Sequence, residues 1–181
     1  FILSIDADLL GTDGDVLSAS RGFAATREAG KTLSRLYVAE SAMTVTGTAA
    51  DHRVPLRPAA MRDFAQALHK AIKGDAAALG ALAGKSGLRR DVLEALASDL
   101  KAAGKNALVV AGPHLPPSVH AATALINDAL GAAGTTLRWN PTPATVPASD
   151  HAEIAKALSA VPDVAILMRE NPVHAWAGGG L

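Results

Sequence analysis

The chain has 181 residues, 49% of them hydrophobic, and its 17 basic and 17 acidic side chains cancel to a formal net charge of zero at pH 7. This balance gives no electrostatic basis for binding nucleic acid or an anionic membrane surface, and no apolar run approaches the ~20 residues that span a bilayer. Cysteine is absent, which excludes disulfides, thiolate zinc sites and cysteine-ligated iron-sulfur clusters within these residues.

A strand, a helix and a second strand are predicted at the start of the chain. Residues 1–5 form a short apolar run that favours a buried strand. A turn-rich segment follows and ends at Asp15, which is expected to cap a helix over residues 16–29. Residues 35–40 form the second predicted strand. Two strands joined by one helix make a βαβ unit, which belongs to a parallel sheet.

The next part of the chain is predicted to hold two helices separated by a linker. Residues 41–57 are irregular and are expected to form a loop with a short extended piece. A helix begins at Pro58, because apolar residues then recur at helical spacing. Glycines punctuate residues 74–87, so this alanine-rich stretch is predicted to be a linker, and residues 91–103 form the following helix.

The centre of the predicted fold is a strand, a turn and a long helix. Residues 107–111 carry almost no polar side-chain atom, as expected for a strand that helices cover on both faces. Gly112 and Pro113 end this strand, Ser118 offers a capping oxygen to the next helix, and Gly131 fits its left-handed end. Prolines in the turn remove N–H donors, so it is not expected to cradle a phosphate group.

Two further strands are predicted near the end of the chain, over residues 135–139 and 164–168. A helix that begins at Ser149 or Asp150 and ends at about Leu158 is expected between them.

The alternation of strands and helices predicts an α/β fold. The expected architecture is a doubly wound, mostly parallel sheet of about five strands with helices on both faces. It forms a single Rossmann-like domain over residues 1–181. Because the sequence begins without methionine inside a predicted strand, we expect it to be a fragment of a longer chain.

The clearest local motif is the pair Asp6 and Asp8, directly after the first strand. It resembles the signature of haloacid dehalogenase phosphatases, in which Asp6 would be the nucleophile, Asp8 the acid and base, and both would help hold Mg²⁺. That family also needs an acidic pair after a later strand, and no Asp-Asp or Gly-Asp pair follows another strand here. A solvated acidic turn is the favoured interpretation. The six histidines are scattered, without the i+3 or i+4 spacing of a metal site on one helix.

Three segments, residues 1–58, 107–131 and 166–173, resemble the molybdopterin oxidoreductase superfamily, whose catalytic subunits carry a Rossmann-like middle domain. The first is similar to a family stretch with an Ala-Asp pair and an apolar-Pro-apolar-Arg-Pro-Gly-Thr-Asp corner. The second is similar to the family's strand, glycine and long helix, and the third to its apolar strand followed by Gly-x-Asn-Pro. The matching polar and proline positions are Asp51, Arg57, Pro58, Asn171 and Pro172.

Two corners of this chain differ from the family pattern. In the active enzymes, the resemblance implies that the Pro-Gly-Thr-Asp corner binds the guanine nucleotide arm of the molybdopterin cofactor. Here Ala59 stands in place of the glycine, and Met61, whose thioether is a weak acceptor, in place of the aspartate. The first strand ends in Asp6-Ala7-Asp8 instead of Gly-x-Asn-Pro. The resemblance therefore implies a vestigial cofactor corner formed by Asp6, Asp8, Asp51, Arg57, Pro58, Met61, Asn171 and Pro172.

Such an altered version is similar to the molybdopterin-like iron-sulfur subunit of alternative complex III, with matching residues at 5–11, 35–41 and 50–53. The resemblance implies a structural domain, without catalytic residues or molybdenum cofactor, in a respiratory complex that passes electrons from quinol to cytochrome c or an oxidase. Iron-sulfur clusters are expected elsewhere in the full chain. The implied partners are other subunits or domains of this membrane-bound complex, on the periplasmic side of the inner membrane. The alternative is the cofactor-binding domain of an active molybdopterin oxidoreductase, which would hold molybdopterin guanine dinucleotide.

Overall fold

The computed structural model describes residues 1–139 and 151–166. The chain divides into two compact units, Phe1–Trp139 and Asn140–Leu181, and each is described by itself. The described part of the second unit contains helix α7 (His151–Ser159), which confirms the helix predicted to end at about Leu158. The prediction of one domain over residues 1–181 stays a prediction.

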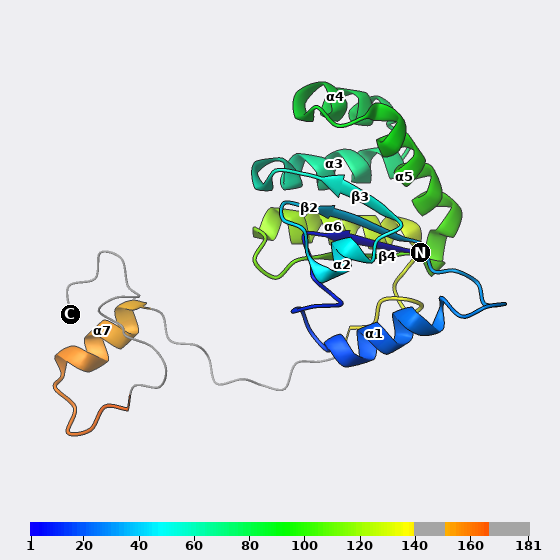
Figure 1. Cartoon of the computed structure of the whole chain (residues 1–181). Coiled ribbons are helices and arrows are strands. Elements are labelled where there is room, and N and C mark those ends of the chain that lie inside the picture. The colour runs from blue at the N-terminus through cyan, green and yellow to red at the C-terminus, as the bar shows by residue number, and fades with distance from the viewer. Residues whose placement is uncertain (140–150, 167–181) are drawn as a thin grey trace. The chain divides into compact units, whose positions relative to one another are not determined.

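The first unit is built on an open sheet of four parallel strands, shown in Figure 1. In the order β3-β2-β1-β4, each strand pairs in parallel with its neighbour. The strands are β1 (Ile2–Ile5), β2 (Leu36–Glu40), β3 (His52–Pro55) and β4 (Leu108–Ala111). The predicted α/β fold is confirmed, but the sheet has four strands within residues 1–139 and 151–166, where about five were expected.

Helices connect the strands and lie on both sides of the sheet, with α1 and α3 on opposite sides in Figure 1. In chain order the helices of this unit are α1 (Val16–Ala25), α2 (Val45–Thr48), α3 (Met61–Ile72), α4 (Ala77–Ser86), α5 (Arg90–Ala103) and α6 (Pro117–Leu130). Short 3-10 turns at Pro58–Ala60 and Gly104–Asn106 precede α3 and β4. No helix among the described residues has both the length and the apolar character needed to cross a membrane.

The hydrophobic core lies on the side of the sheet that α3 and α6 cover. Alternate strand residues such as Leu3 and Ile5 point to this side and are fully buried. Helix α3 packs there through Phe64 and Leu68, one turn apart, and α6 packs through Ile126. The helical spacing predicted for these two segments is therefore confirmed.

The predicted strand over residues 135–139 is wrong. The structure has only an isolated bridge there, between Ala133 and Leu137. The physical reason is that the outer edge of β4 is already occupied. The side chain of Asn127 accepts from the Val109 N–H (3.0 Å) and donates to the Val109 carbonyl (2.7 Å), and the Thr136 hydroxyl donates to the Ala107 carbonyl (2.5 Å). A further strand would have to displace these bonds.

The opposite edge of the sheet is blunted in a different way. The Leu56 N–H, directly after β3, donates to the Glu40 carbonyl of β2 (2.9 Å). The backbone groups of successive residues point alternately toward and away from a neighbouring strand. Those of Arg53 and Pro55 therefore point away from β2. Proline has no N–H to offer a neighbouring strand. Proline at such a position is a known way to stop a sheet from extending.

Three other predictions are corrected. Residues 74–87 are not a linker, because α4 forms there and buries Leu79 and Leu82 against the core. Ser118 does not cap α6, whose N-cap is Pro116 and has no side-chain bond. In the predicted strand over residues 164–168, the described residues 164–166 are exposed and not in a strand, and the remaining two lie outside the described residues.

Candidate functional site

The carboxyl edge of β1 and β4 is the place where an open α/β sheet usually holds a ligand. The two strands are parallel neighbours, with Ile5 aligned to Ala111, so the loops after them leave the same edge. Helix α1 follows β1 and α6 follows β4, and these helices lie on opposite faces of the sheet. The two loops therefore diverge at the topological switch point, where such sheets usually bind their ligands.

Asp6 lies at this switch point and its backbone is held in an unusual conformation. It has a φ of 48°, in the left-handed region that residues other than glycine seldom adopt. The Asp6 N–H donates to the Ala39 carbonyl (2.7 Å), and its carboxylate accepts from the Ser41 N–H (2.8 Å) and the Ser41 hydroxyl (3.2 Å). These hydrogen bonds to the end of β2 hold Asp6 in the left-handed conformation and offset its unfavourable backbone energy.

The loop after β4 packs directly against Asp6. The Gly112 N–H donates to the Ile5 carbonyl (2.9 Å), and a Cβ atom on Gly112 would lie 2.0 Å from the Asp6 carbonyl oxygen, so only glycine fits. Nε2 of His114 lies 3.1 Å from Oδ2 of Asp6. The Asp6 side chain is 8% exposed and that of His114 is 61% exposed. The imidazole thus covers the carboxylate from the solvent side.

Asp8 organises the loop between β1 and α1. Its Oδ1 accepts from the Thr46 N–H (3.0 Å) and hydroxyl (2.7 Å), and its backbone N–H donates to Oδ2 of Asp13 (2.7 Å). Partial burial raises the pKa of Asp8, but the hydrogen bonds donated by Thr46 outweigh this effect, so the pKa lies below the usual value of the carboxyl group. A Cβ atom on Gly11 would clash with this carboxylate at 2.0 Å. Asp8 therefore fixes the loop to α2.

Glu40 carries a second buried carboxylate at this edge. It is 1% exposed, forms an ion pair with Arg53, and accepts from the Thr44 hydroxyl (2.7 Å). A Cβ atom on Gly47 would lie 1.9 Å from its Oε1. Glycine at this position of α2 thus leaves room for the buried ion pair.

The structure does not bring Asp51 to the same edge. Asp51 precedes β3, at the amino end of the sheet, where Arg27 donates two hydrogen bonds (2.8 and 2.7 Å) and the Leu36 N–H donates one (2.8 Å). The hydrogen bond from Arg27 is the main cause that lowers the pKa of Asp51. This carboxylate fastens the end of α1 to β2.

The remaining residues of the expected corner lie in different surroundings. Arg57 and Pro58 are exposed after β3, and Arg57 lines a pocket of about 280 Å³. Met61 is 0% exposed and packs in the core beside α3 residues, so its side chain does not line this pocket. Asn171 and Pro172 lie outside the described residues. Asp6, Asp8, Arg57 and Pro58 therefore follow carboxyl ends of strands, whereas Asp51 and Met61 do not contribute to that surface.

The buried Glu40 at the end of β2 was not predicted from the sequence as a site residue. The groups that meet Asp6 and Asp8 were not predicted either: Ser41, Thr46, His114 and, as a packing requirement, Gly112. Each follows the carboxyl end of a strand or begins a short helix, so their meeting depends on strand order. The only available signal was that Gly112 and His114 follow an apolar strand, where α/β proteins place functional groups.

The carboxylates at this edge of the sheet form hydrogen bonds with other groups of the protein. Both oxygens of the Asp6 carboxylate and both oxygens of the Asp8 carboxylate already accept hydrogen bonds from the protein. Among residues 1–139 and 151–166, no three histidine, aspartate or glutamate side chains come together as a metal site. No protein-family model matches the chain, and no curated protein matches it significantly.

Proposed function

We propose that the chain is a structural, non-catalytic domain of a molybdopterin oxidoreductase-like iron-sulfur subunit in a respiratory electron-transfer complex. The complex passes electrons from quinol to cytochrome c or an oxidase, and lies on the periplasmic side of the inner membrane. The domain keeps the doubly wound α/β architecture and presents its surfaces to partner subunits. The iron-sulfur clusters belong to other parts of the subunit, since these 181 residues contain no cysteine.

The close packing at the switch point is the observation that supports this proposal. Gly112 packs on the Asp6 carbonyl, and His114 covers the Asp6 carboxylate, so the place of a ligand is taken by the chain itself. The residues also do not fit a guanine nucleotide arm. The buried carboxylate of Asp6 at the switch point repels a pyrophosphate, and Met61 is buried in the core and carries no strong acceptor.

Metal analysis of the full-length protein, extracted from its native membrane, tests this proposal. We expect several iron atoms and no molybdenum per subunit. Stoichiometric molybdenum would instead favour the cofactor-binding domain of an active molybdopterin oxidoreductase.

Calorimetric titration of the 181-residue chain with GDP and with molybdopterin guanine dinucleotide gives an independent test. We expect no saturable heat. Binding tighter than about 10 μM, roughly 6.8 kcal/mol, would mean that the nucleotide site is intact and the domain is not structural.

A haloacid dehalogenase-like phosphatase is a second candidate, favoured by Asp6 and Asp8 after the first strand. The bonds to Ser41, Thr46 and His114 weaken it, because a nucleophilic carboxylate needs a free oxygen aimed at the substrate. We expect Mg²⁺ with orthovanadate to leave the melting temperature unchanged. A ligand present at 100 times its dissociation constant would stabilise the fold by about 2.7 kcal/mol, so a clear increase that Asp6→Asn abolishes would favour the phosphatase.

A further inference from the structure

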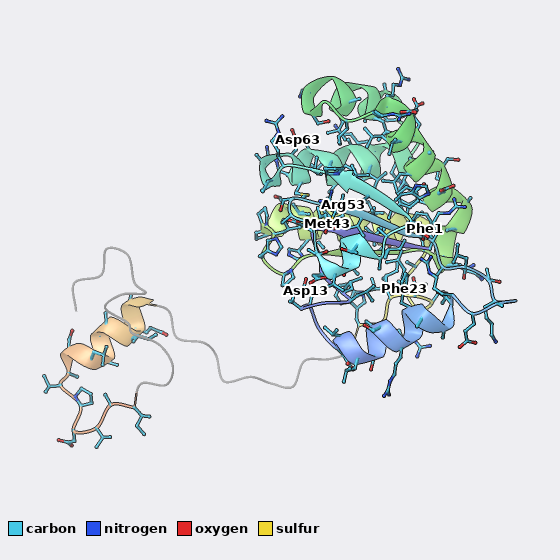
Figure 2. All side chains as sticks on the ribbon, in the orientation of Figure 1. Phe1, Asp13, Phe23, Met43, Arg53 and Asp63 are labelled. Atoms are coloured by element: carbon cyan, nitrogen blue, oxygen red, sulfur yellow. The ribbon has the colours of Figure 1, made fainter. Side chains whose placement is uncertain are left out.

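A hollow of about 310 Å³ lies between α1 and the sheet. Its floor is the strand face that points away from α3 and α6, and its roof is the underside of α1, with Phe23 labelled in Figure 2. The floor residues are Ile2, Leu36, Leu108 and Val110. Ile2, Leu108 and Val110 remain partly accessible, and none of the residues of α1 is buried. The two layers therefore face each other without interlocking.

The lining of the hollow is mostly apolar. No charged side chain lines it. Four hydroxyl-bearing residues stand at its border, Ser34 among them. The other three hydroxyls donate within the protein: Ser18 to Asp15 (2.6 Å), Thr26 to the Phe23 carbonyl (2.8 Å) and Thr46 to Asp8 (2.7 Å). A charged or strongly polar molecule would lose its hydration here without compensation. The occupant is therefore an uncharged molecule that is mostly hydrocarbon.

The size of the hollow favours a small molecule over a polypeptide. The volume of the hollow is about twice that of a 150 Å³ apolar cavity that binds benzene. Because benzene has six carbon atoms, the hollow has room for a molecule of about twelve carbon atoms. A helix is about 10 Å across, and α1 already covers the sheet where a partner helix would have to pack. The loop before α1 is held to Thr46 by Asp8 and by the Leu10 N–H, and the chain after α1 is held by the ion pair between Arg27 and Asp51. None of the α1 residues is buried, so an outward displacement of the helix would lose little buried surface.

We propose that this hollow is a binding site for an uncharged hydrophobic small molecule of about twelve carbon atoms. The molecule inserts between the sheet and α1 and contacts Leu36, Leu108 and Phe23. This site lies on the α1 side of the sheet and goes beyond the proposed function, since it does not depend on the relationship to any respiratory complex.

The probe is a series of linear alcohols from 1-hexanol to 1-tetradecanol, added to the 181-residue chain with labelled methyl groups. We expect saturable shifts of the methyl signals of Ile2, Leu36, Leu108 and Val110, while those of Leu68 and Ile126 in the packed core stay in place. Each added methylene group strengthens binding about fourfold until the hollow is full, as expected from the transfer of one CH₂ group. The gain stops near about twelve carbons.

Two matched variants show where the alcohols bind. Gly22 lines the hollow and has open space where a Cβ would lie, and Gly84 in α4 has the same open space away from it. We expect Gly22→Leu to fill the hollow and weaken 1-decanol binding at least about tenfold, and Gly84→Leu to leave it unchanged.

The proposal is overturned by shifts that do not saturate, by equal weakening in both variants, or by an affinity that keeps rising to 1-tetradecanol. It is also overturned if the same methyl signals shift with protein concentration alone and sedimentation detects a dimer, because a second copy of the chain then covers the hollow. Saturable binding that only Gly22→Leu weakens supports it.

Discussion

The two faces of the sheet are covered by helices of very different fit. On one face, α3 and α6 bury Leu3, Ile5 and Val109 to 1% exposure or less, and α4 and α5 pack against α3. On the other face, α1 places none of its residues in the interior and leaves a hollow above Leu108. The same strands supply both faces with apolar residues. The difference teaches that apolar strand residues alone do not make a core, because the covering helix must interlock with them.

The largest effect is expected from removing one phenylalanine on each face. Phe64→Ala empties a fully buried site and should lower the free energy of unfolding by about 3–5 kcal/mol. Phe23 is only half-buried and stacks on Arg27, at 4.4 Å from the ring centroid, so Phe23→Ala should cost about 1 kcal/mol. Urea unfolding of both variants measures the contrast. Equal losses would show that α1 packs as tightly as α3.

The next effect concerns how each face is fastened to its helix. Asn127→Leu removes the amide that ties α6 to β4 and leaves the N–H and carbonyl of Val109 without partners, at a cost of about 2–3 kcal/mol. Asn106→Leu makes the same change at an exposed position and should cost little. Amide exchange at Val109 should accelerate only in the first variant. Unchanged exchange there would mean that another group protects this edge.

The fastening of α1 is expected to be weaker and to depend on pH. Asp51→Asn removes the carboxylate that forms the ion pair with Arg27. This partly exposed pair should contribute about 1 kcal/mol to the free energy of unfolding after solvent screening. Because the folded pKa of Asp51 is lowered, its contribution is fully present above about pH 4, the pKa of an unfolded aspartate, and is lost as the pH falls through the folded pKa. Thermal unfolding of both proteins from pH 7 to pH 2 should show the difference shrinking. A difference that grows on acidification would contradict this assignment.

The smallest effect is a gain of stability on the loosely covered face. Gly22→Ala should stabilise α1 by about 0.5–1 kcal/mol, because a new Cβ meets nothing within 4 Å and glycine is a poor helix former. Gly84→Ala in α4 gives the same propensity gain away from the hollow. If Gly22→Ala stabilises more than Gly84→Ala, the excess measures burial against the sheet. A loss at position 22 would show that α1 and the sheet already touch there.

The spacing of apolar residues in the sequence predicted those strands and helices whose formation depends on neighbouring residues. The apolar runs of β1, β2 and β4 and the helical spacing of α3 and α6 were sufficient to place these elements. Residues 135–139 have a composition typical of strands, but whether a strand forms depends on a free sheet edge. That edge is blocked by the side chain of Asn127 in α6. The role of Asn127 cannot be recognised from the residues next to it in the sequence.

The site was predictable in position but not in its contacts. The sequence placed Asp6 and Asp8 at the carboxyl edge, because they directly follow an apolar strand. Their partners Ser41, Thr46 and His114 come from three other loops, which strand order brings together. The left-handed backbone of Asp6 has no sequence signal at all, since aspartate adopts many conformations. Asp51 was expected in the cofactor corner because of the family resemblance, whereas it lies at the opposite end of the sheet.

The blunted edges of the sheet restrict how this molecule can join others. Asn127 occupies the outward backbone groups of Val109 in β4, Thr136 bonds to the Ala107 carbonyl just before β4, and Pro55 removes an outward donor from β3. Subunits and fibrils often grow by continuing a ladder of backbone hydrogen bonds across such edges, which any polypeptide can offer. With both edges obstructed, a protein that binds this domain would have to recognise side chains on helices and loops, which differ from protein to protein. The sheet is thereby protected from indiscriminate pairing with other polypeptides.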